Sequence, residues 1–261
     1  MITHRDDLQD RFDDEIAAMG VRIKDANQFK VREDVFDEVT LLALYKLVHK
    51  KHLSVIGGSI STGKEANVFY AEHDGEPIAL KIYRVRTANF TTMGQYMTGD
   101  RRFSGIGTSR KALIFAWAKK EFSNLKRAAE AGIPVPKPLI WDRNILLIGF
   151  LGKDEQPYPQ LRNVTLEDPA ATYGTIIGYI KTLYTTAKLV HADLSEYNIL
   201  YGDQVYMIDM GQSVTLDHPQ ALRFLVRDIQ NINRFFRTKT EVMEEKEIFT
   251  AVTGISSNYE P

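Results

Sequence analysis

The sequence predicts an α+β protein with two lobes, a β-rich N-terminal lobe and a mainly helical C-terminal lobe. Strand-like runs of branched and aromatic residues are concentrated in residues 54–83 and return at 145–148. Apolar residues at helical spacing occupy residues 111–131, 170–190 and 219–237. With 261 residues, of which 44% are hydrophobic, the chain can build one large domain or two lobes, each with a sizeable core.

Three segments are expected along the chain: an N-terminal helical extension at 1–53, the β-rich lobe at 54–151 and the helical lobe at 152–261. Within the extension, residues 6–19 and 34–52 have helical patterns, and the second has a broad apolar face. The stretch Gly149-Phe150-Leu151-Gly152 marks the expected connection between the lobes.

Residues 84–110 are rich in Thr, Ser, Gly and Arg, and we expect them to form a long mobile loop. Compact domains rarely keep so long a loop without a functional reason. The helix predicted over 111–131 should end at Gly132, because glycine readily adopts the left-handed conformation that closes a helix.

The composition excludes several classes of site. The chain has no Cys, which rules out disulfides, thiolate catalysis and Cys-bound zinc. The formal net charge of −1 provides no global basic field for DNA or RNA. No run of about 18 apolar residues could span a membrane, and the charged start of the chain shows no signal peptide. We therefore expect a soluble, cytoplasmic protein.

A cluster of polar residues follows the predicted 170–190 helix. His191, Asp193 and Asn198 have the spacing His-x-Asp-x-x-x-x-Asn. Alone, this spacing is weak, because loop Asp and Asn side chains that cap turns would also explain it. Two apolar runs around the turn residues Gly202-Asp203 strengthen it, since a hairpin folded there brings Asp209 to the level of Asn198.

An Asp, an Asn and a second Asp at one point suit a phosphotransferase of the kinase type. Asn198 and Asp209 can share one Mg²⁺, which prefers a few protein oxygens together with phosphate oxygens. Asp193 then lies within reach of a hydroxyl that accepts a phosphoryl group. We expect Asp193 to be catalytic and Asn198 and Asp209 to bind the metal.

A small-residue loop precedes this cluster in the chain. Gly58–Lys64 nearly matches the Walker pattern, but Glu65 replaces the required Ser or Thr, and a strand-like run follows where a Walker loop opens a helix. The kinase pattern G-x-G-x-x-G-x-V fits better. An ordinary tight turn between strands is the alternative. The nucleotide-binding residues expected here are Ser61, Thr62, Gly63, Lys64, Glu65, Ala66 and Val68.

Lys81 is expected to bind nucleotide phosphates. It ends Ile78-Ala79-Leu80-Lys81, which is similar to the V-A-I-K strand of kinases. A Lys within an apolar strand is costly unless it is paired. Glu121 and Glu130 are the candidate partners on the following helix. We choose Glu121, which lies mid-helix, although a surface position beside Lys119 and Lys120 would also explain it.

Three motifs together resemble the RIO family of atypical protein kinases: Ser-Thr-Gly-Lys-Glu-Ala at 61–66, His-Ala-Asp-Leu-Ser-Glu-Tyr-Asn at 191–198, and Ile-Asp-Met-Gly-Gln at 208–212. The first motif is similar to the RIO-one subfamily of the archaeal type. The resemblance covers roughly residues 30 to 237. It implies a two-lobed kinase-like fold without the activation loop and the peptide-docking helices, and the sequence agrees, since no A-P-E motif follows Asp209.

The resemblance also implies ligands and activities. ATP and Mg²⁺, or Mn²⁺, would be bound, and protein serines would be phosphorylated, including serines of the chain itself. A part in small ribosomal subunit maturation is implied, as is ATP hydrolysis with Asp209 as a transient phosphoryl acceptor. Adenine would be bound by backbone groups of Gly149 and Leu151. Ala192 departs from the Arg of ordinary kinases, so control by a phosphate on the activation loop is not expected.

Two other functions compete with a protein kinase. An aminoglycoside- or choline-type kinase shares the Asp and Asn spacing, although little chain remains for its larger pocket. A nucleotide-switched assembly factor that turns over slowly is the second. If the chain phosphorylates itself, the segment 84–110 is the expected place, with Ser104, Thr108 and Ser109 as candidates.

Overall fold

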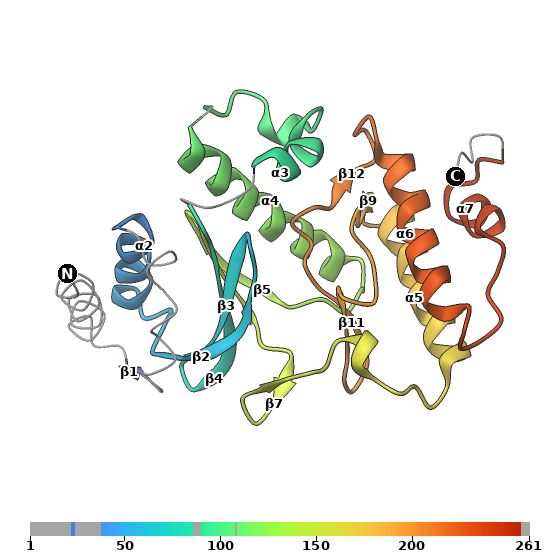
Figure 1. Cartoon of the computed structure of the whole chain (residues 1–261). Coiled ribbons are helices and arrows are strands. Elements are labelled where there is room, and N and C mark those ends of the chain that lie inside the picture. Colours follow the sequence, from blue (N-terminus) through green and yellow to red (C-terminus); the bar gives the residue numbers. More distant parts are fainter. Residues whose placement is uncertain (1–21, 24–37, 86–89, 108, 257–261) are drawn as a thin grey trace, which may run out of the picture. The chain divides into compact units, whose positions relative to one another are not determined.

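The computed structural model of the chain describes residues 22–23, 38–85, 90–107 and 109–256 (Figure 1). The chain forms two compact units that draw on interleaved segments. Unit 1 contains residues 1–90, 105–122 and 138–157, and unit 2 contains residues 91–104, 123–137 and 158–261. The lobes expected at 54–151 and 152–261 are each one continuous segment, whereas each of these units combines three segments. The expected limits stay a prediction.

Unit 1 is built on a six-stranded sheet with the order β1-β2-β3-β4-β6-β5. The strands are β1 (Arg22–Ile23), β2 (Val55–Thr62), β3 (Ala66–His73), β4 (Glu76–Tyr83), β5 (Pro138–Asp142) and β6 (Ile145–Gly149). β1 pairs with β2 in parallel, and all other pairs are antiparallel. A short ribbon of β7 (Gly152–Lys153) and β8 (Gln156–Pro157) follows.

β3 and β4 form a hairpin that turns at Asp74-Gly75. β3 and β4 pair from Ala66↔Tyr83 to His73↔Glu76 without interruption. Asp74 and Gly75 both have positive φ, 52° and 82°, which is the backbone conformation that two-residue hairpin turns need. This turn fixes the register of β4 and therefore the face on which each of its side chains lies.

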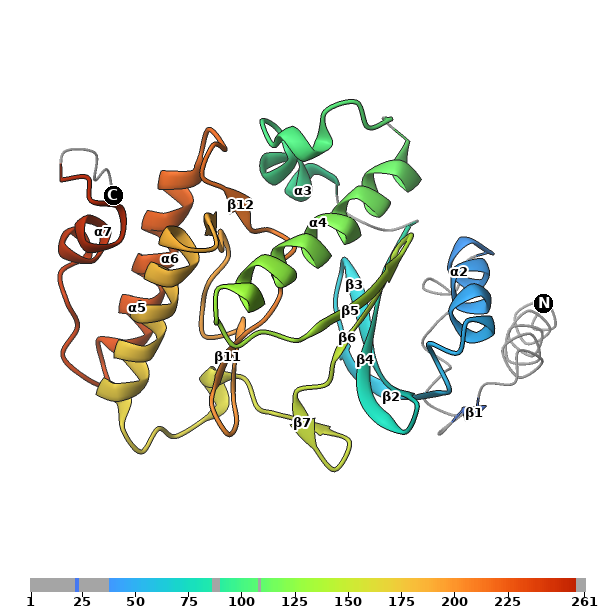
Figure 2. The ribbon, with the colours of Figure 1, turned by 180° about the vertical axis from the view of Figure 1, so that it is seen from behind.

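Helix α2 (Glu38–His49) packs against one face of this sheet (Figure 2). Leu44 and Leu47 of the helix share a hydrophobic core with Phe69, Leu80 and Ile82. The helix predicted over 34–52 is thus confirmed over Glu38–His49, and residues 50–52 form a turn. The residues 6–19 and 34–37 lie outside the described residues.

Unit 2 is mainly helical. It contains α5 (Pro169–Thr185), α6 (Ala221–Phe236) and α7 (Glu245–Thr253), and the short helices η2 (Arg101–Phe103) and η3 (Leu161–Asn163). α5 and α6 run side by side in both views (Figures 1 and 2). Two small ribbons complete the unit: β9 (Leu189–Val190) with β12 (Val214–Thr215), and β10 (Ile199–Tyr201) with β11 (Val205–Met207).

The division between the units falls within helix α4 (Arg110–Glu130), after Phe122. This helix and its end at Gly132, where φ is 82°, agree with the prediction. α5 ends earlier than expected, because the chain turns at Lys188, with φ of 55°, to form β9. α7 was not anticipated from the sequence.

The expected long loop at 84–110 is wrong for the described part of that segment. Helix α3 (Phe90–Met97) and η2 lie there. Met93 and Tyr96, three positions apart, are both buried, so the helix has an apolar stripe that its Thr- and Gly-rich composition conceals. Ser104 follows η2 directly, Ser109 precedes α4, and Thr108 lies outside the described residues.

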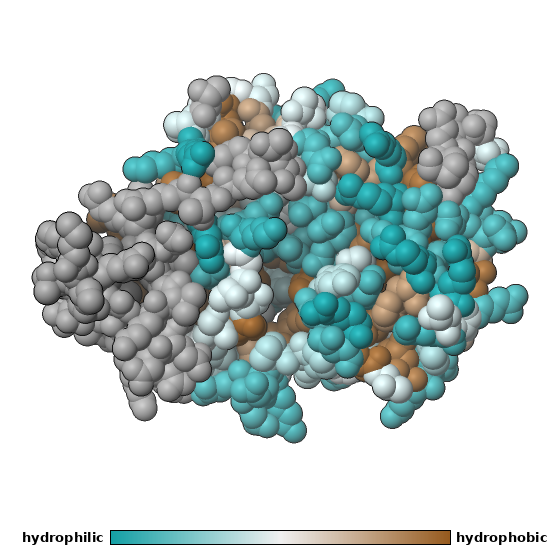
Figure 3. Space-filling model, in the orientation of Figure 1, coloured by the Kyte–Doolittle hydropathy of each residue, from teal (hydrophilic) through white to brown (hydrophobic). Residues whose placement is uncertain are grey.

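Hydrophilic residues dominate the described surface in Figure 3, with hydrophobic residues scattered among them. Within the described ranges, none of the helices combines the length and the apolar character that crossing a membrane would require. The fold class expected from the sequence is confirmed, with a sheet-rich unit and a mainly helical unit.

Candidate active site

Lys81 lies in the middle of the sheet of unit 1, between Val68 on β3 and Leu146 on β6. Its neighbours Leu80 and Ile82 point into the core under α2. Because side chains alternate along a strand, Lys81 lies on the other face. Only 8% of it is exposed, so its ammonium group needs a partner within unit 1.

That partner is Glu121 on α4. The Lys81 Nζ lies 2.7 Å from the Glu121 Oε1, and Glu121 is 1% exposed. The hydroxyl of Tyr83 donates to the other carboxylate oxygen, Oε2. Glu130 has an exposed side chain 3.9 Å from Lys126. The structure therefore confirms the expected contact with Glu121 and not the alternative with Glu130.

The loop of small residues joins β2 to β3. Ser61 pairs with Val68 and Thr62 with Asn67, and the Gly63 N–H donates to the Ala66 carbonyl at 2.9 Å. A Cβ on Gly63 would lie 2.9 Å from that oxygen, so the turn requires glycine. A strand follows the loop, which rules out the Walker alternative.

The loop residues differ in exposure. The first four, Ser61, Thr62, Gly63 and Lys64, are exposed, whereas Glu65, Ala66 and Val68 are half-buried. Gly149 ends β6 opposite Ile78, and Leu151 follows after Phe150, whose ring packs edge-on against Tyr70. The assignment of all these residues to nucleotide binding stays a prediction.

In unit 2 the predicted hairpin is confirmed. β10 and β11 pair from Ile199↔Met207 to Tyr201↔Val205, and the Ile208 N–H donates to the Asn198 carbonyl at 3.0 Å. This brings Asp209 beside Asn198. The Asn198 Nδ2 donates to the Asp193 carbonyl at 2.8 Å and to the Asp193 Oδ2 at 3.0 Å. The three predicted residues therefore lie together.

Two residues of this cluster have left-handed backbone: Ala192, with φ of 68°, and Asp209, with φ of 62°. Such conformations cost roughly 1–3 kcal/mol in a non-glycine residue and persist only where the surroundings enforce them. The Ala192 carbonyl accepts a hydrogen bond from the Arg227 guanidinium. The Asp228 carboxylate accepts the N–H groups of Ala192 at 2.8 Å and Leu194 at 2.9 Å.

Asp228 was missed in the sequence. It is buried on α6 between Leu225 and Ile229. The available signal was a charged residue on the apolar face of a strongly amphipathic helix, where an ionised group is rarely found without partners. Burial raises the pKa of Asp228 to about 7, although the two backbone N–H groups work against that rise.

Burial also raises the pKa of Asp193 to about 6, and the nearby negative charge of Asp209 raises it further, while the hydrogen bond from Asn198 lowers it. His191 is buried and its pKa is lowered by burial to about 4, so its ring is neutral. The His191 Nε2 lies 3.0 Å from the Ile208 carbonyl. His191 is thus a structural brace for the residue that precedes Asp209.

These residues fit a divalent cation. The Asn198 amide nitrogen is bound to Asp193, which leaves its carbonyl oxygen as a ligand. Asp209 adds a carboxylate, and a cation would relieve the repulsion between Asp193 and Asp209. An amide oxygen and one carboxylate suit Mg²⁺, which completes its octahedron with water and phosphate oxygens.

Residues 67–248 match the family model of the RIO domain. The chain belongs to the RIO family.

Its RIO relatives include two archaeal proteins of similar length. The RIO-type serine/threonine-protein kinase Rio1 of Haloferax volcanii is 42% identical over 95% of this chain and 86% of its own. The protein of the same name from Methanocaldococcus jannaschii is 41% identical over 86% of this chain and 78% of its own. The chain spans less of its eukaryotic relatives, for example 43% of human RIO1.

A solved structure has a similar fold. The Rio2 kinase of Chaetomium thermophilum, crystallised as a complex with ADP, Mg²⁺ and phosphoaspartate, matches with a TM-score of 0.63 and 26% identity, over 86% of this chain and 68% of that one. The kinase-like fold expected from the sequence is therefore confirmed.

Proposed function

We propose that the chain is an ATP- and Mg²⁺-dependent serine/threonine protein kinase that phosphorylates a protein serine, including its own. The observation that carries this proposal is the cluster of Asp193, Asn198 and Asp209, which combines a candidate base with two oxygen ligands for a cation. The buried Lys81–Glu121 pair supports it, as do relatives that are named serine/threonine-protein kinases.

In this proposal both sets of residues bind one nucleotide. Backbone N–H groups of the loop at 61–68 bind phosphates, and Glu121 keeps Lys81 charged and oriented toward them. Asn198 and Asp209 would hold Mg²⁺, which when bound neutralises phosphate charge. Asp193 orients the acceptor hydroxyl and takes its proton as the bond from oxygen to the γ-phosphorus forms and the bond to ADP breaks.

A finer proposal is that the chain also hydrolyses ATP, with Asp209 as a transient phosphoryl acceptor, and takes part in small ribosomal subunit maturation. The phosphoaspartate in the Chaetomium Rio2 structure supports the first part. The second part depends on the family resemblance alone. ATP hydrolysis stimulated by small ribosomal subunits would favour this nucleotide switch, whereas transfer to free protein serines would favour the kinase.

The substitution Asp193→Ala tests the main proposal. We expect phosphoryl transfer to fall by about 10²–10⁴-fold, because general-base and positioning contributions are lost. The thermal midpoint should change little. Asp203→Asn is the matched control, since Asp203 is an exposed carboxylate in the nearby hairpin turn whose oxygen accepts from Tyr206. Equal turnover of Asp193→Ala and the parent would remove Asp193 from the mechanism.

A further inference from the structure

Asp209 needs support on both sides of its left-handed backbone. On the preceding side, the N–H of Ile208 is bound to the Asn198 carbonyl, and the carbonyl of Ile208 is bound to His191. On the following side, the segment Met210–Ser213 leads into β12. In ordinary kinases this segment continues into an activation loop, whereas here α6 begins at Ala221.

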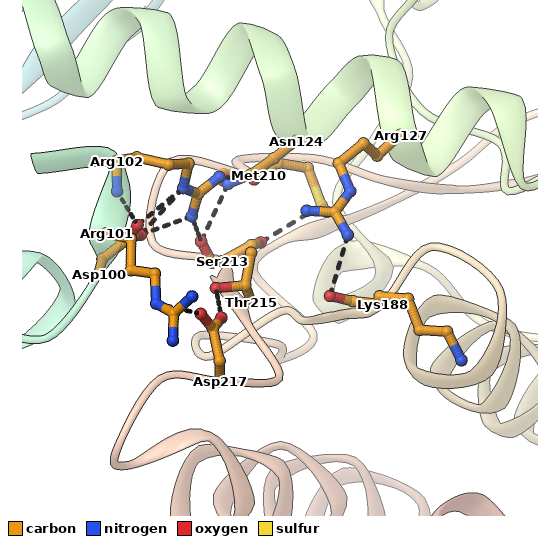
Figure 4. A network of polar contacts seen from close by, with 10 residues as sticks. All are labelled: Asp100, Arg101, Arg102, Asn124, Arg127, Lys188, Met210, Ser213, Thr215 and Asp217. Carbon is orange, nitrogen blue, oxygen red and sulfur yellow. Dashed lines mark hydrogen bonds and ion pairs between the residues drawn. The ribbon is translucent and has the colours of Figure 1, made fainter.

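Asn124 on α4 holds the segment Met210–Ser213, which follows Asp209 (Figure 4). This side chain is fully buried, with 0% exposure. Its Nδ2 donates to the carbonyl of Met210 at 2.8 Å and to the carbonyl of Ser213 at 2.9 Å. One amide group therefore bridges both ends of the turn that begins directly after Asp209.

Arg102 fixes the orientation of that amide. One guanidinium nitrogen donates to the Asn124 Oδ1 at 2.6 Å, so the Nδ2 must face the two carbonyls. The Asp100 carboxylate in turn holds the guanidinium through Nε at 2.9 Å and a terminal nitrogen at 2.6 Å. Asp100 is buried and also caps η2 through the Arg102 N–H at 2.9 Å. A bidentate ion pair of this kind fixes the direction of the guanidinium as well as its distance from the carboxylate.

We propose that Asn124 and Arg102 are positioning residues that hold Asp209 in its metal-binding conformation. This inference depends on the proposed function, because it assigns Asp209 to the metal. Asn124 and Arg102 do not touch the reacting atoms and act through the Met210–Ser213 backbone. The ion pair between the buried Asp100 and the half-buried Arg102 thus supplies a restraint that ordinary kinases obtain from a phosphate on the activation loop.

The substitution Asn124→Asp tests the inference, because it keeps the shape of the side chain and removes both donors. Two properties are measured: amide hydrogen exchange of residues 208–214, and the affinity for Mn²⁺ in the presence of a non-hydrolysable ATP analogue. We expect faster exchange in this segment and a Mn²⁺ affinity lower by about tenfold or more, as for other residues that orient metal ligands.

Arg101→Ala is the matched control. Arg101 is adjacent to Arg102 in sequence and carries the same charge. Its side chain, however, is 88% exposed and lies 3.4 Å from the half-exposed Asp217. Exchange and Mn²⁺ affinity should both match the parent. Arg102→Lys is the second variant, for use if Asn124→Asp does not fold. It keeps the charge and loses the bidentate geometry. We expect faster exchange and a lower Mn²⁺ affinity here too, but both changes should be smaller.

Two results would overturn the inference. One is unchanged exchange at 208–214 in a folded Asn124→Asp or Arg102→Lys variant. The other is faster exchange with unchanged Mn²⁺ affinity, which would make the network a brace without influence on Asp209. Both results differ from a failure of the proposed function, in which the parent itself would bind no Mn²⁺ with the nucleotide analogue.

Discussion

The two sets of candidate site residues are held in different ways. In unit 1, Lys81 and Glu121 lie on a strand and a helix, and the register of β4 together with the helical repeat of α4 places them. In unit 2, Asp193, Asn198 and Asp209 lie on loops whose backbone is left-handed at Ala192 and Asp209. Side chains distant in sequence hold these loops: Asp228 is one, and Asn124 is another.

This difference indicates what the loss of a supporting contact would do to each set of residues. A side chain on a regular element keeps its place through many backbone hydrogen bonds, so losing its partner affects charge more than position. A side chain on a strained loop depends on a few bonds from buried polar groups. Each of those bonds is costly to leave unmade, because the freed backbone group has no access to water.

The largest loss of stability is expected for Glu121→Ala in unit 1. It leaves the buried Lys81 ammonium without its carboxylate, which typically costs about 3–5 kcal/mol of stability. Phosphoryl transfer should also fall by about 10²–10³-fold, since the Lys81 ammonium loses the carboxylate that orients it toward the phosphates. Thermal unfolding and a phosphorylation assay measure the two effects. Glu130→Ala, which changes an exposed Glu on the same helix, should match the parent, and an equal loss in both variants would refute the pairing.

The next effect is expected for Asp228→Ala in unit 2. Two buried N–H groups, of Ala192 and Leu194, lose their acceptor, at about 1–3 kcal/mol each. Denaturant unfolding should show a combined loss of about 2–6 kcal/mol. Asn231→Ala is the control, because its Nδ2 makes one bond of 3.1 Å to the Leu194 carbonyl from a half-buried position, and it should cost about 1 kcal/mol or less. Equal losses would contradict the role given to Asp228.

A smaller, pH-dependent effect is expected at His191. Burial lowers its pKa from 6.5 to about 4 in the folded chain. The unfolded chain therefore binds the extra proton first, and the stability contributed by neutral His191 is complete above pH 6.5 and is lost as the pH falls toward 4. The total is about 3 kcal/mol at most.

The raised pKa values of Asp193 and Asp228 act in the opposite direction, because those carboxyls take up protons in the folded chain first. The comparison with His191→Gln isolates the histidine. Between pH 6.5 and 4 the parent should lose more stability than the variant, as measured by denaturant unfolding at each pH. Parallel pH profiles would show that His191 is not held neutral.

The sequence predicts most of unit 1 and the chemistry of the loops in unit 2. The run of branched and apolar residues in 76–83 predicts the strand that carries Lys81, and Gly202-Asp203 predicts the hairpin that brings Asp209 to Asn198. What holds the loops was not predictable. The bonds from Asn124 to Met210 and from Asp228 to Ala192 join residues far apart in the chain, and no local periodicity encodes such pairs. Helix α3 was missed because it is short and lies in a segment, 84–110, that is rich in Thr, Ser, Gly and Arg.

The central proposal is that Lys81 and Asp209 act on the same triphosphate. A crystal structure of the chain with Mg²⁺ and a non-hydrolysable ATP analogue tests it most directly. We expect the Lys81 ammonium on the α- and β-phosphate oxygens, Asn198 and Asp209 on the cation of that nucleotide, and Asp193 facing its γ-phosphorus. A nucleotide bound by only one of the two sets, with the other set remote from any phosphate, would contradict the account.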